Sequence, residues 1–204
     1  MDGVIVDSNP VHREAWAAFN RKYGIETTDE MHQRMYGRRN DQIVRDFFGD
    51  RLSPAEVHAR GAEKEALYRE MMSEHLQDAL VPGVLQFLEE YPETPKALVT
   101  NAETENVDFL LDRAGLRKYF QTVVDGRQVV NPKPHPEIYL RASALLDLPP
   151  EKCIVFEDSF TGVAAGLAAG MKVVGLYTTH GDLPGTSIAV HNFLSGELRR
   201  WLRG

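Results

Sequence analysis

The sequence predicts an α/β protein in which a parallel β-sheet domain is interrupted by an inserted group of helices. Between residues 77 and 204, short apolar runs alternate with helical patterns, which is typical of a parallel sheet buried on both faces. Residues 9–76 contain helical patterns and no candidate strand. We therefore expect an α/β core domain formed by residues 1–8 and 77–204, and an all-α helical domain at residues 9–76.

The inserted region contains several signals for helix starts and stops. Asn9, which is followed by proline, is a candidate helix cap, and Gly24 is a candidate stop. Thr27 is followed three residues later by glutamate, which is the spacing of a capping box. Asn40 and Ser53 are candidate caps of two further helices. The region is therefore predicted to be a compact helical bundle.

Short apolar runs mark the predicted strands of the core domain. They lie at residues 97–99, 123–124, 153–156 and 173–176. Helical patterns separate and follow them, at residues 82–91, 105–114, 136–146, 160–169 and 194–202. Residues 4–6 form one more apolar run, which we interpret as a strand or the end of one.

Composition and charge restrict the class of protein. The formal net charge of -7 repels nucleic acid and anionic membranes, so neither is an expected partner, and a phosphate ester would need a local cation. No run approaches the ~18 apolar residues of a membrane span, and no basic segment precedes an apolar stretch at the N-terminus. The single cysteine, Cys153, favours a reducing compartment, so we expect a cytoplasmic protein.

Polar side chains follow the predicted strands, at the edge of a parallel sheet where ligands bind. They are Asp7, Thr100 and Asn101, Lys133, and Glu157 and Asp158, and Asp2 lies just before the run at residues 4–6. A single carboxylate after a strand is more often a helix cap than a ligand. Carboxylates gathered at one edge, however, repel one another unless a cation lies among them, and hard oxygen ligands suit Mg²⁺. Their recurrence at successive strand ends therefore favours a functional site.

The segments around these residues resemble the four motifs of the haloacid dehalogenase superfamily, and within it the β-phosphoglucomutase-like branch. The motif-like segments are residues 1–8, 98–102, 133–136 and 155–159. His12, Trp16 and residues 37–40 are similar to positions of the helical cap in that branch. Order and spacing agree over essentially the whole chain. The resemblance implies a haloacid dehalogenase-like Rossmannoid core with an inserted helical cap domain.

The resemblance also implies a role for each motif residue. Asp2 matches the general acid/base, and its backbone carbonyl matches a Mg²⁺ ligand. Thr100 and Lys133 match the groups that hold the transferring phosphoryl group. Asp158 matches a direct metal ligand, and Glu157 matches a ligand that is direct or acts through water. The implied activity is Mg²⁺-dependent phosphoryl transfer on a small phosphorylated metabolite, expected to be a sugar phosphate, by a phosphatase or phosphomutase.

Other residues are candidates for binding the substrate. Asn101 can donate to phosphate oxygens, and His12 can contact the substrate or relay protons. Arg38 and Arg39 precede a predicted helix at Asn40, where they can bind a phosphate or sugar hydroxyls. The alternatives are two solvated surface arginines and a histidine that is only packed. We expect the protein to be a monomer.

One feature of the family is not found in this sequence. The family's nucleophile is an aspartate two positions before Asp2, directly ahead of Met1, and it forms an aspartyl-phosphate. We expect the native chain to extend upstream through such an aspartate. The alternative is a non-catalytic protein that binds a phosphate or sugar phosphate. A response-regulator receiver domain is a third interpretation, which the inserted helices and the chain length disfavour.

Overall fold

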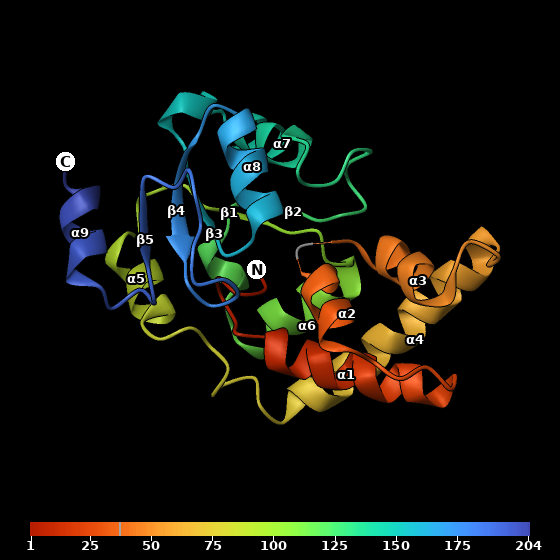
Figure 1. The fold of residues 1–204 in the computed structure, drawn as a ribbon. Coiled ribbons are helices and arrows are strands. Elements are labelled where there is room, and N and C mark those ends of the chain that lie inside the picture. Colours follow the sequence, from red (N-terminus) through yellow and green to blue (C-terminus); the bar gives the residue numbers. More distant parts are fainter. Residues whose placement is uncertain (37) are drawn as a thin grey trace.

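The computed structural model describes residues 1–36 and 38–204 and has the predicted α/β architecture (Figure 1). The first helices are α1 (Asn9–Lys22), α2 (Asp29–Met35), α3 (Asn40–Phe48), α4 (Pro54–Ser73) and α5 (Val84–Glu90). Strands and helices then alternate: β1 (Ala97–Val99), α6 (Thr104–Arg113), β2 (Thr122–Val124), α7 (Glu137–Leu145), β3 (Ile154–Glu157), α8 (Phe160–Ala168), β4 (Lys172–Leu176), β5 (Ile188–Val190) and α9 (Gly196–Leu202). Short 3-10 turns lie at Arg117–Tyr119 and Pro150–Lys152.

All the ladder pairs between these strands are parallel, as the sequence predicts. β1 pairs with β2, and β3, β4 and β5 form a second sheet in that order. Successive residues of β4 pack on opposite faces: Val173 lies in a cluster with α7 and α8, and Val174 in a cluster with α5, α6 and α9. The sheet is therefore buried on both faces, which explains why its strands are continuous apolar runs.

An apolar cavity separates the two sheets. It has a volume of about 310 Å³ and is lined by all of β1 and by residues 153–156 at β3, together with side chains of α5 and α7. β1 and β3 each have a ladder partner on one side within the described residues. The cavity therefore lies where one more strand would join the two sheets.

Residues 1–8 correct one prediction. The apolar run at residues 4–6 forms a turn instead of a strand, because the amide of Ile5 donates to the carbonyl of Met1 at 2.7 Å. Gly3 has a φ of +67°, which a glycine adopts readily. Val6 contacts Leu80 through an isolated antiparallel bridge, and its side chain is fully buried. The apolar character of this segment reflects its burial in the main core.

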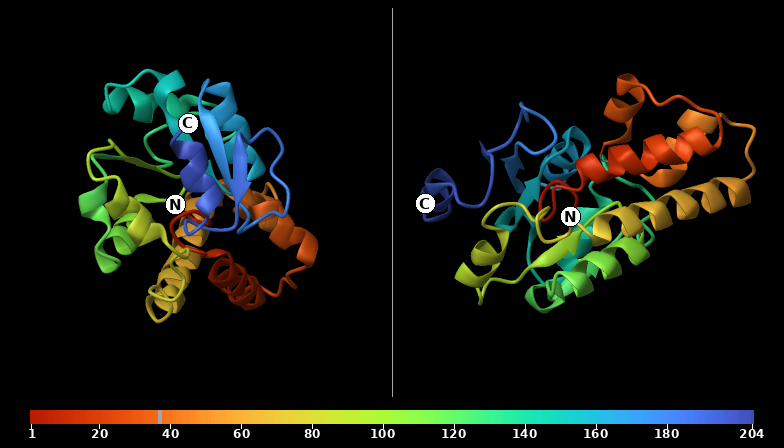
Figure 2. Two further views of the ribbon diagram at one scale, coloured as in Figure 1. Left: turned by 90° about the vertical axis from the view of Figure 1, so that its left-hand side faces the viewer. Right: turned by 90° about the horizontal axis from the view of Figure 1, so that it is seen from below.

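Helices α1 to α4 form a group beside the sheets. Their own core contains Trp16, Phe19, Met35, Ile43, Val44 and Val57. The long helix α4 connects this core to the main one, since Tyr68 and Met72 near its end are buried there. Figures 1 and 2 place α9 at the opposite end of the molecule from α3. No helix among residues 1–36 and 38–204 is long and apolar enough to cross a bilayer.

In the inserted region, three of the predicted helix caps differ from the structure by one residue. Ser53 caps α4 in a capping box, as predicted, whereas α2 is capped by Thr28 and not by Thr27. Asn9 and Asn40 are the first residues of their helices and not the caps. Their amide groups donate across the molecule instead, Asn9 to Thr179 and Asn40 to two glutamates. Short polar residues at helix starts are therefore also used here for tertiary contacts.

Candidate active site

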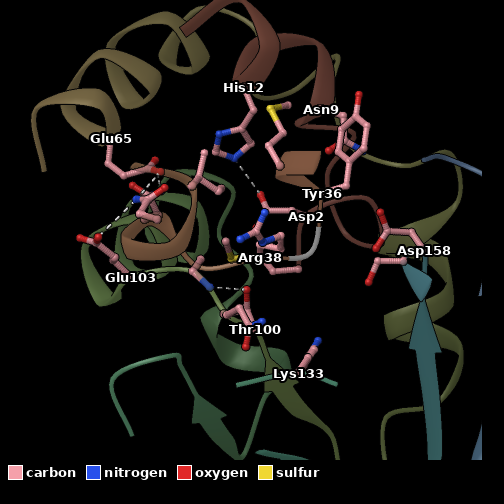
Figure 3. A pocket seen from close by; sticks show the side chains of 18 of the residues that line it. Asp2, Asn9, His12, Tyr36, Arg38, Glu65, Thr100, Glu103, Lys133 and Asp158 are labelled. Atoms are coloured by element: carbon pink, nitrogen blue, oxygen red, sulfur yellow. Dashed lines mark hydrogen bonds and ion pairs between the residues drawn. The ribbon is translucent and has the colours of Figure 1, made fainter. Parts of the chain in front are cut away.

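The predicted site residues gather around one cavity between helices α1–α4 and the carboxyl ends of the strands (Figure 3). Its volume is about 120 Å³. The predicted residues that line it are Asp2, His12, Arg38, Asn40, Thr100, Asn101, Lys133, Glu157 and Asp158. Arg39 lies in a neighbouring cavity, and Gly37 lies outside the described residues. Segments distant in sequence therefore converge as the predicted motifs require.

Asp2 lies in the turn that precedes α1, where two side chains hold its carboxylate. Ser8 donates to Asp2 Oδ1 at 2.6 Å, and His12 Nε2 lies 3.5 Å from the same oxygen. Burial alone would favour the neutral acid, but the hydrogen bonds from His12 and Ser8 hold the pKa of Asp2 well below its usual range. Asp2 is therefore ready to act as a base before a substrate binds.

His12 has a defined tautomer because of Lys64 on α4. The Nζ of Lys64 lies 2.8 Å from His12 Nδ1, and an ammonium group can only donate, so Nδ1 is the acceptor. The proton of a neutral His12 is then on Nε2, the nitrogen nearest to Asp2. The imidazole also stacks on Tyr68, with ring centroids 3.8 Å apart. These contacts direct an N–H group toward the Asp2 carboxylate.

Lys64, Glu65 and Tyr68 also belong to the site, although their sequence pattern did not predict it. Lys64 is only 1% exposed and donates to Glu65 Oε1 at 2.8 Å, and Glu65 is 3% exposed. Burial opposes ionisation of Glu65, but the charge of Lys64 and the hydrogen bonds to its carboxylate lower the pKa of Glu65 to about 2. A charged pair on a helix normally predicts a solvated surface. Lys64 and Tyr68 are four residues apart, which places both on one face of the helix, and this spacing could have indicated that they act together.

Glu157 at the end of β3 holds Lys133 in the cavity. Its Oε1 accepts from the ammonium of Lys133 and from the hydroxyl of Tyr139, and its Oε2 accepts from Ser159 Oγ at 3.1 Å. Although burial raises the pKa of Glu157, the Lys133 charge outweighs it and lowers that pKa to about 2. Gly162 makes this position possible, because a Cβ there would lie 2.0 Å from Glu157 Cδ.

Asp158 is adjacent to the backbone of the first motif. A Cβ at Gly3 would lie 1.8 Å from Asp158 Oδ2, so only glycine allows this close approach. Thr179 donates to the same oxygen. Burial and the neighbouring charge of Glu157 raise the pKa of Asp158 to about 7. A cation near Asp158 would remove much of this electrostatic cost.

Thr100 and Asn101 follow β1 at the floor of the cavity. The Thr100 amide donates to the carbonyl of Val124 at 3.0 Å, which continues the β1–β2 ladder. Its hydroxyl oxygen accepts from the amide of Ala102 at 3.1 Å, so the hydroxyl proton is directed elsewhere. Thr100 is buried, so its hydroxyl is a rigidly held donor at the cavity floor.

The side of the cavity formed by the helices is fixed by polar pairs. Arg38 donates to the carboxylate of Asp46, and Arg39 lies 3.5 Å from Asp41. Asn40 Nδ2 donates to Glu65 at 2.7 Å and to Glu103 at 3.3 Å. Glu103 belongs to the core, so Asn40 joins the helical group to the segment after β1.

The candidate metal ligands of the cavity differ in how well they fit Mg²⁺. Within the described ranges, residues 1–36 and 38–204, no group of three or more His, Cys, Asp or Glu side chains is arranged so that it could hold a metal ion. The Glu157 carboxylate is used by Lys133 and Tyr139, whereas Asp158 is a hard oxygen donor whose charge is poorly compensated. Asp158 therefore fits Mg²⁺ as a ligand, and the metal needs further oxygen donors.

Comparisons with known proteins identify the family and the fold. Residues 1–170 match the haloacid dehalogenase-like hydrolase family. The chain is 35% identical to a phosphorylated carbohydrates phosphatase of Thermotoga maritima, over 84% of this chain and 80% of that one. It is 30% identical to a fructose-1-phosphate phosphatase of Escherichia coli, over 85% and 92%. The structure of β-phosphoglucomutase from Clostridium difficile superposes with a TM-score of 0.86 and 25% identity, covering 98% of this chain and 92% of that one. The chain therefore belongs to the haloacid dehalogenase-like hydrolase family, as its motifs predicted.

Proposed function

We propose that this enzyme transfers the phosphoryl group of a small sugar or polyol phosphate through an aspartyl-phosphate, with Mg²⁺. The observation that carries the proposal is the convergence of Asp2, Thr100, Lys133 and Asp158 on one cavity. The phosphatase and phosphomutase activities of the named relatives support it. The proposal includes residues 9–76 as the cap domain, residues 1–8 and 77–204 as the core, and a cytoplasmic monomer.

Thr100 and Lys133 bind the phosphoryl oxygens in this proposal. The Lys133 ammonium is buried and held by Glu157, so it meets the developing negative charge with little reorganisation. The hydroxyl of Thr100 donates to a second oxygen. Asn101, which also lines the cavity, contacts the phosphate or the atoms next to it.

Asp2 protonates the leaving oxygen and later takes a proton from the attacking group. A bound phosphate dianion beside Asp2 raises the pKa of its carboxyl, which favours the protonated form needed for the first step. His12 positions the carboxylate through its Nε2–H, and Lys64 keeps that tautomer. Since His12 and Lys64 come from α1 and α4, the helical cap contributes to the acid/base machinery.

Mg²⁺ would be held by Asp158 and the backbone carbonyl of Asp2, with Glu157 acting directly or through water. When bound, it neutralises the charge of the phosphate and orients the ester. The close approach of Asp158 to Gly3 supports this assignment, because it brings the carboxylate next to the backbone of the first motif.

The mechanism also requires a nucleophilic carboxylate, which the proposal places directly ahead of Met1. Met1 lines both the candidate active site and the apolar cavity between the sheets. A strand in that cavity would lead the chain to the required position. The cavity therefore supports an upstream segment that supplies both a strand and the aspartate.

The test compares chains extended upstream with either aspartate or asparagine directly before Met1. We expect Mg²⁺-dependent release of phosphate from p-nitrophenyl phosphate and from sugar phosphates only with aspartate. Asp158→Asn and Lys133→Ala in the aspartate chain should abolish activity, and the 204-residue chain should react no faster than its Asp2→Ala variant. Phosphate binding without turnover by the aspartate chain would instead indicate a non-catalytic binding protein.

A further inference from the structure

The end of the cavity remote from Asp158 has a chemistry that the phosphoryl transfer itself does not use. Glu65, Glu103 and Asn40 form this end, which we name the carboxylate wall. Figure 3 shows Glu65 and Glu103 together, on the opposite side of Asp2 from Asp158. When Thr100 and Lys133 hold the phosphate of a ligand, the other end of that ligand can contact the carboxylate wall.

We propose that the carboxylate wall selects monophosphates whose other end is uncharged and hydroxylated, and excludes a second phosphate, so that the enzyme is a hydrolase and not a mutase. This inference rests on the proposed phosphoryl transfer and narrows its substrate class. It depends on three features of the described residues: the rigidity of the wall, its hydrogen-bonding character and its charge.

The wall is rigid because its central carboxylate is buried and fully oriented. Glu65 Oε1 accepts from Asn40 and Lys64, and its Oε2 accepts from Asn106 at 2.6 Å. Arg69 donates to the same Asn106 at 2.7 Å. The network joins α4 of the helical group to α6 of the core. Glu65 therefore cannot turn away from an unfavourable ligand without breaking several hydrogen bonds.

The wall presents mostly acceptors. Both amide hydrogens of Asn40 are directed at glutamates, at 2.7 and 3.3 Å, which leaves its Oδ1 as the atom it can offer. Glu103 and Glu65 carry only acceptor oxygens when ionised. Sugar hydroxyls can donate to such a surface. A phosphate dianion has no proton to donate, so it gains no hydrogen bond from these oxygens.

The charges of the cavity also disfavour a second phosphate. Among the described residues that line it, five carboxylates (Asp2, Glu65, Glu103, Glu157 and Asp158) face three cationic side chains. Each of those cations already has a carboxylate partner: Lys64 has Glu65, Lys133 has Glu157, and Arg38 has Asp46. One divalent metal ion offsets one phosphate. A second phosphate would meet Glu65 and Glu103 with no additional cation to compensate it.

The exclusion of a second phosphate determines the reaction type, because a mutase must bind a bisphosphate. When the phosphoryl group passes from the enzyme's aspartate to a second hydroxyl of a bound sugar monophosphate, the aspartyl O–P bond breaks, a new O–P bond to the sugar forms, and the hydroxyl proton passes to Asp2. The product is a sugar bisphosphate. In hydrolysis, a water oxygen bonds to phosphorus, the aspartyl O–P bond breaks, the water proton passes to Asp2, and inorganic phosphate leaves. Only hydrolysis avoids a second anionic group at the wall.

A neighbouring cavity of about 330 Å³ contains the arginines that could reverse this selectivity. Arg39, Arg45 and Arg127 line it, and it shares Asn40 and Glu103 with the candidate active site. Glu103 lies between the two, with Oε2 3.4 Å from Arg127 Nη2. Because Glu103 lines both cavities, a second phosphate near these arginines would also lie close to its carboxylate. Glu103 is therefore the residue whose charge should determine the selectivity.

The experiment measures binding and turnover of matched esters by the chain that carries the upstream aspartate, with Mg²⁺. The pairs are fructose 1-phosphate with fructose 1,6-bisphosphate, and glucose 1-phosphate with glucose 1,6-bisphosphate. Calorimetry is expected to show that at least one monophosphate binds at least about tenfold more tightly than its bisphosphate. Phosphorus NMR should show inorganic phosphate and no isomerised sugar phosphate.

Variants at Glu103 and Glu105 provide the matched comparison. Both glutamates pair with Arg127, but Glu105 does not line the cavity. Glu103→Gln should reduce the preference for the monophosphate and Glu103→Lys should reduce it further, whereas Glu105→Gln should leave it unchanged. Equal affinity for both members of every pair, binding of neither, or an unchanged preference in Glu103→Gln would overturn the inference. Selective binding without any phosphate release would instead count against the proposed catalysis.

Discussion

At the scale of single residues, the most unusual feature of the site is a buried chain of polar groups from Glu65 through Lys64 and His12 to Asp2. Each contact has a defined donor, because the lysine ammonium can only donate and therefore fixes the histidine tautomer. Buried ion pairs are costly to form and more costly to break. Their retention between α1 and α4 is consistent with a role in positioning Asp2.

Glu65 should make stability depend on pH in a defined window. Its pKa is lowered from 4.5 to about 2 in the folded state, so its stabilising contribution is complete above pH 4.5 and is lost as the pH falls toward 2. The contribution is about 3 kcal/mol from the size of this shift. Urea unfolding should show that Glu65→Gln is less stable than the wild type at pH 6 and that the difference shrinks between pH 4.5 and 2.5. Glu70→Gln on the same helix, at an exposed glutamate, is the control; a difference independent of pH would contradict the assignment.

His12 should affect catalysis more than binding. His12→Ala removes the Nε2–H group beside Asp2, so kcat should fall by about 100-fold while KM changes much less. The acidic limb of the kcat profile should also move, because the Asp2 pKa loses one of the groups that lower it. Steady-state kinetics over pH in the chain with the upstream aspartate would test this. His135→Ala, at an exposed histidine, should behave as the wild type, and an equal loss in both variants would argue against a role in positioning.

At the scale of elements, the site depends on close contacts between strand ends and the turns beside them. The start of α8 passes over Glu157, and Asp158 touches the turn at Gly3. Both contacts occur where a glycine removes a side chain that would otherwise collide. The carboxylates are therefore positioned by backbone packing as well as by hydrogen bonds.

Gly162→Ala should disturb Lys133 through this packing. Its Cβ would collide with the carboxylate of Glu157, which would move and release the lysine. We expect a loss of about 2 kcal/mol in the free energy of unfolding, together with a large decrease in kcat. Gly181→Ala is the control, because nothing lies within 4 Å of a Cβ at that position. Unchanged stability and activity in Gly162→Ala would show that Glu157 has other room to move.

At the scale of the whole molecule, two sheets and a helical group surround two cavities of opposite character. The polar cavity lies between helices α1–α4 and the strand ends, and the apolar cavity lies between β1 and β3. Met1 lines both of them. The two cavities therefore meet at the first motif. A strand placed in the apolar cavity would direct a side chain at its end toward the polar cavity.

An upstream strand should therefore stabilise the protein as well as supply the nucleophile. It would pair with β1 and β3 and fill an apolar cavity of about 310 Å³. We expect the extended chain to gain several kcal/mol in the free energy of unfolding, because filling cavities and burying apolar side chains both stabilise a core. Urea unfolding of the 204-residue chain, of a chain extended by an apolar strand that ends in aspartate, and of one with a Gly/Ser extension of equal length would measure this. Equal stability of the two extended chains would mean that no strand occupies the cavity.

The sequence alone determined the fold class, the order of most elements and most of the site. Parallel strands buried on both faces must be apolar runs, so β1 to β4 were visible, and the polar residues after them identified Thr100, Lys133 and Asp158 as candidates. Asp2 was identified by its resemblance to the first motif of the family. Tertiary structure decided what local patterns cannot encode. β5 is a short, half-buried strand that only its neighbour β4 defines, residues 4–6 are apolar because of burial without being a strand, and Lys64 and Glu65 resemble a solvated helix face until the core covers them. The physical reason is that a hydrophobic pattern indicates how much of a residue is buried. The contacts that the residue makes depend on which distant segments the fold brings next to it.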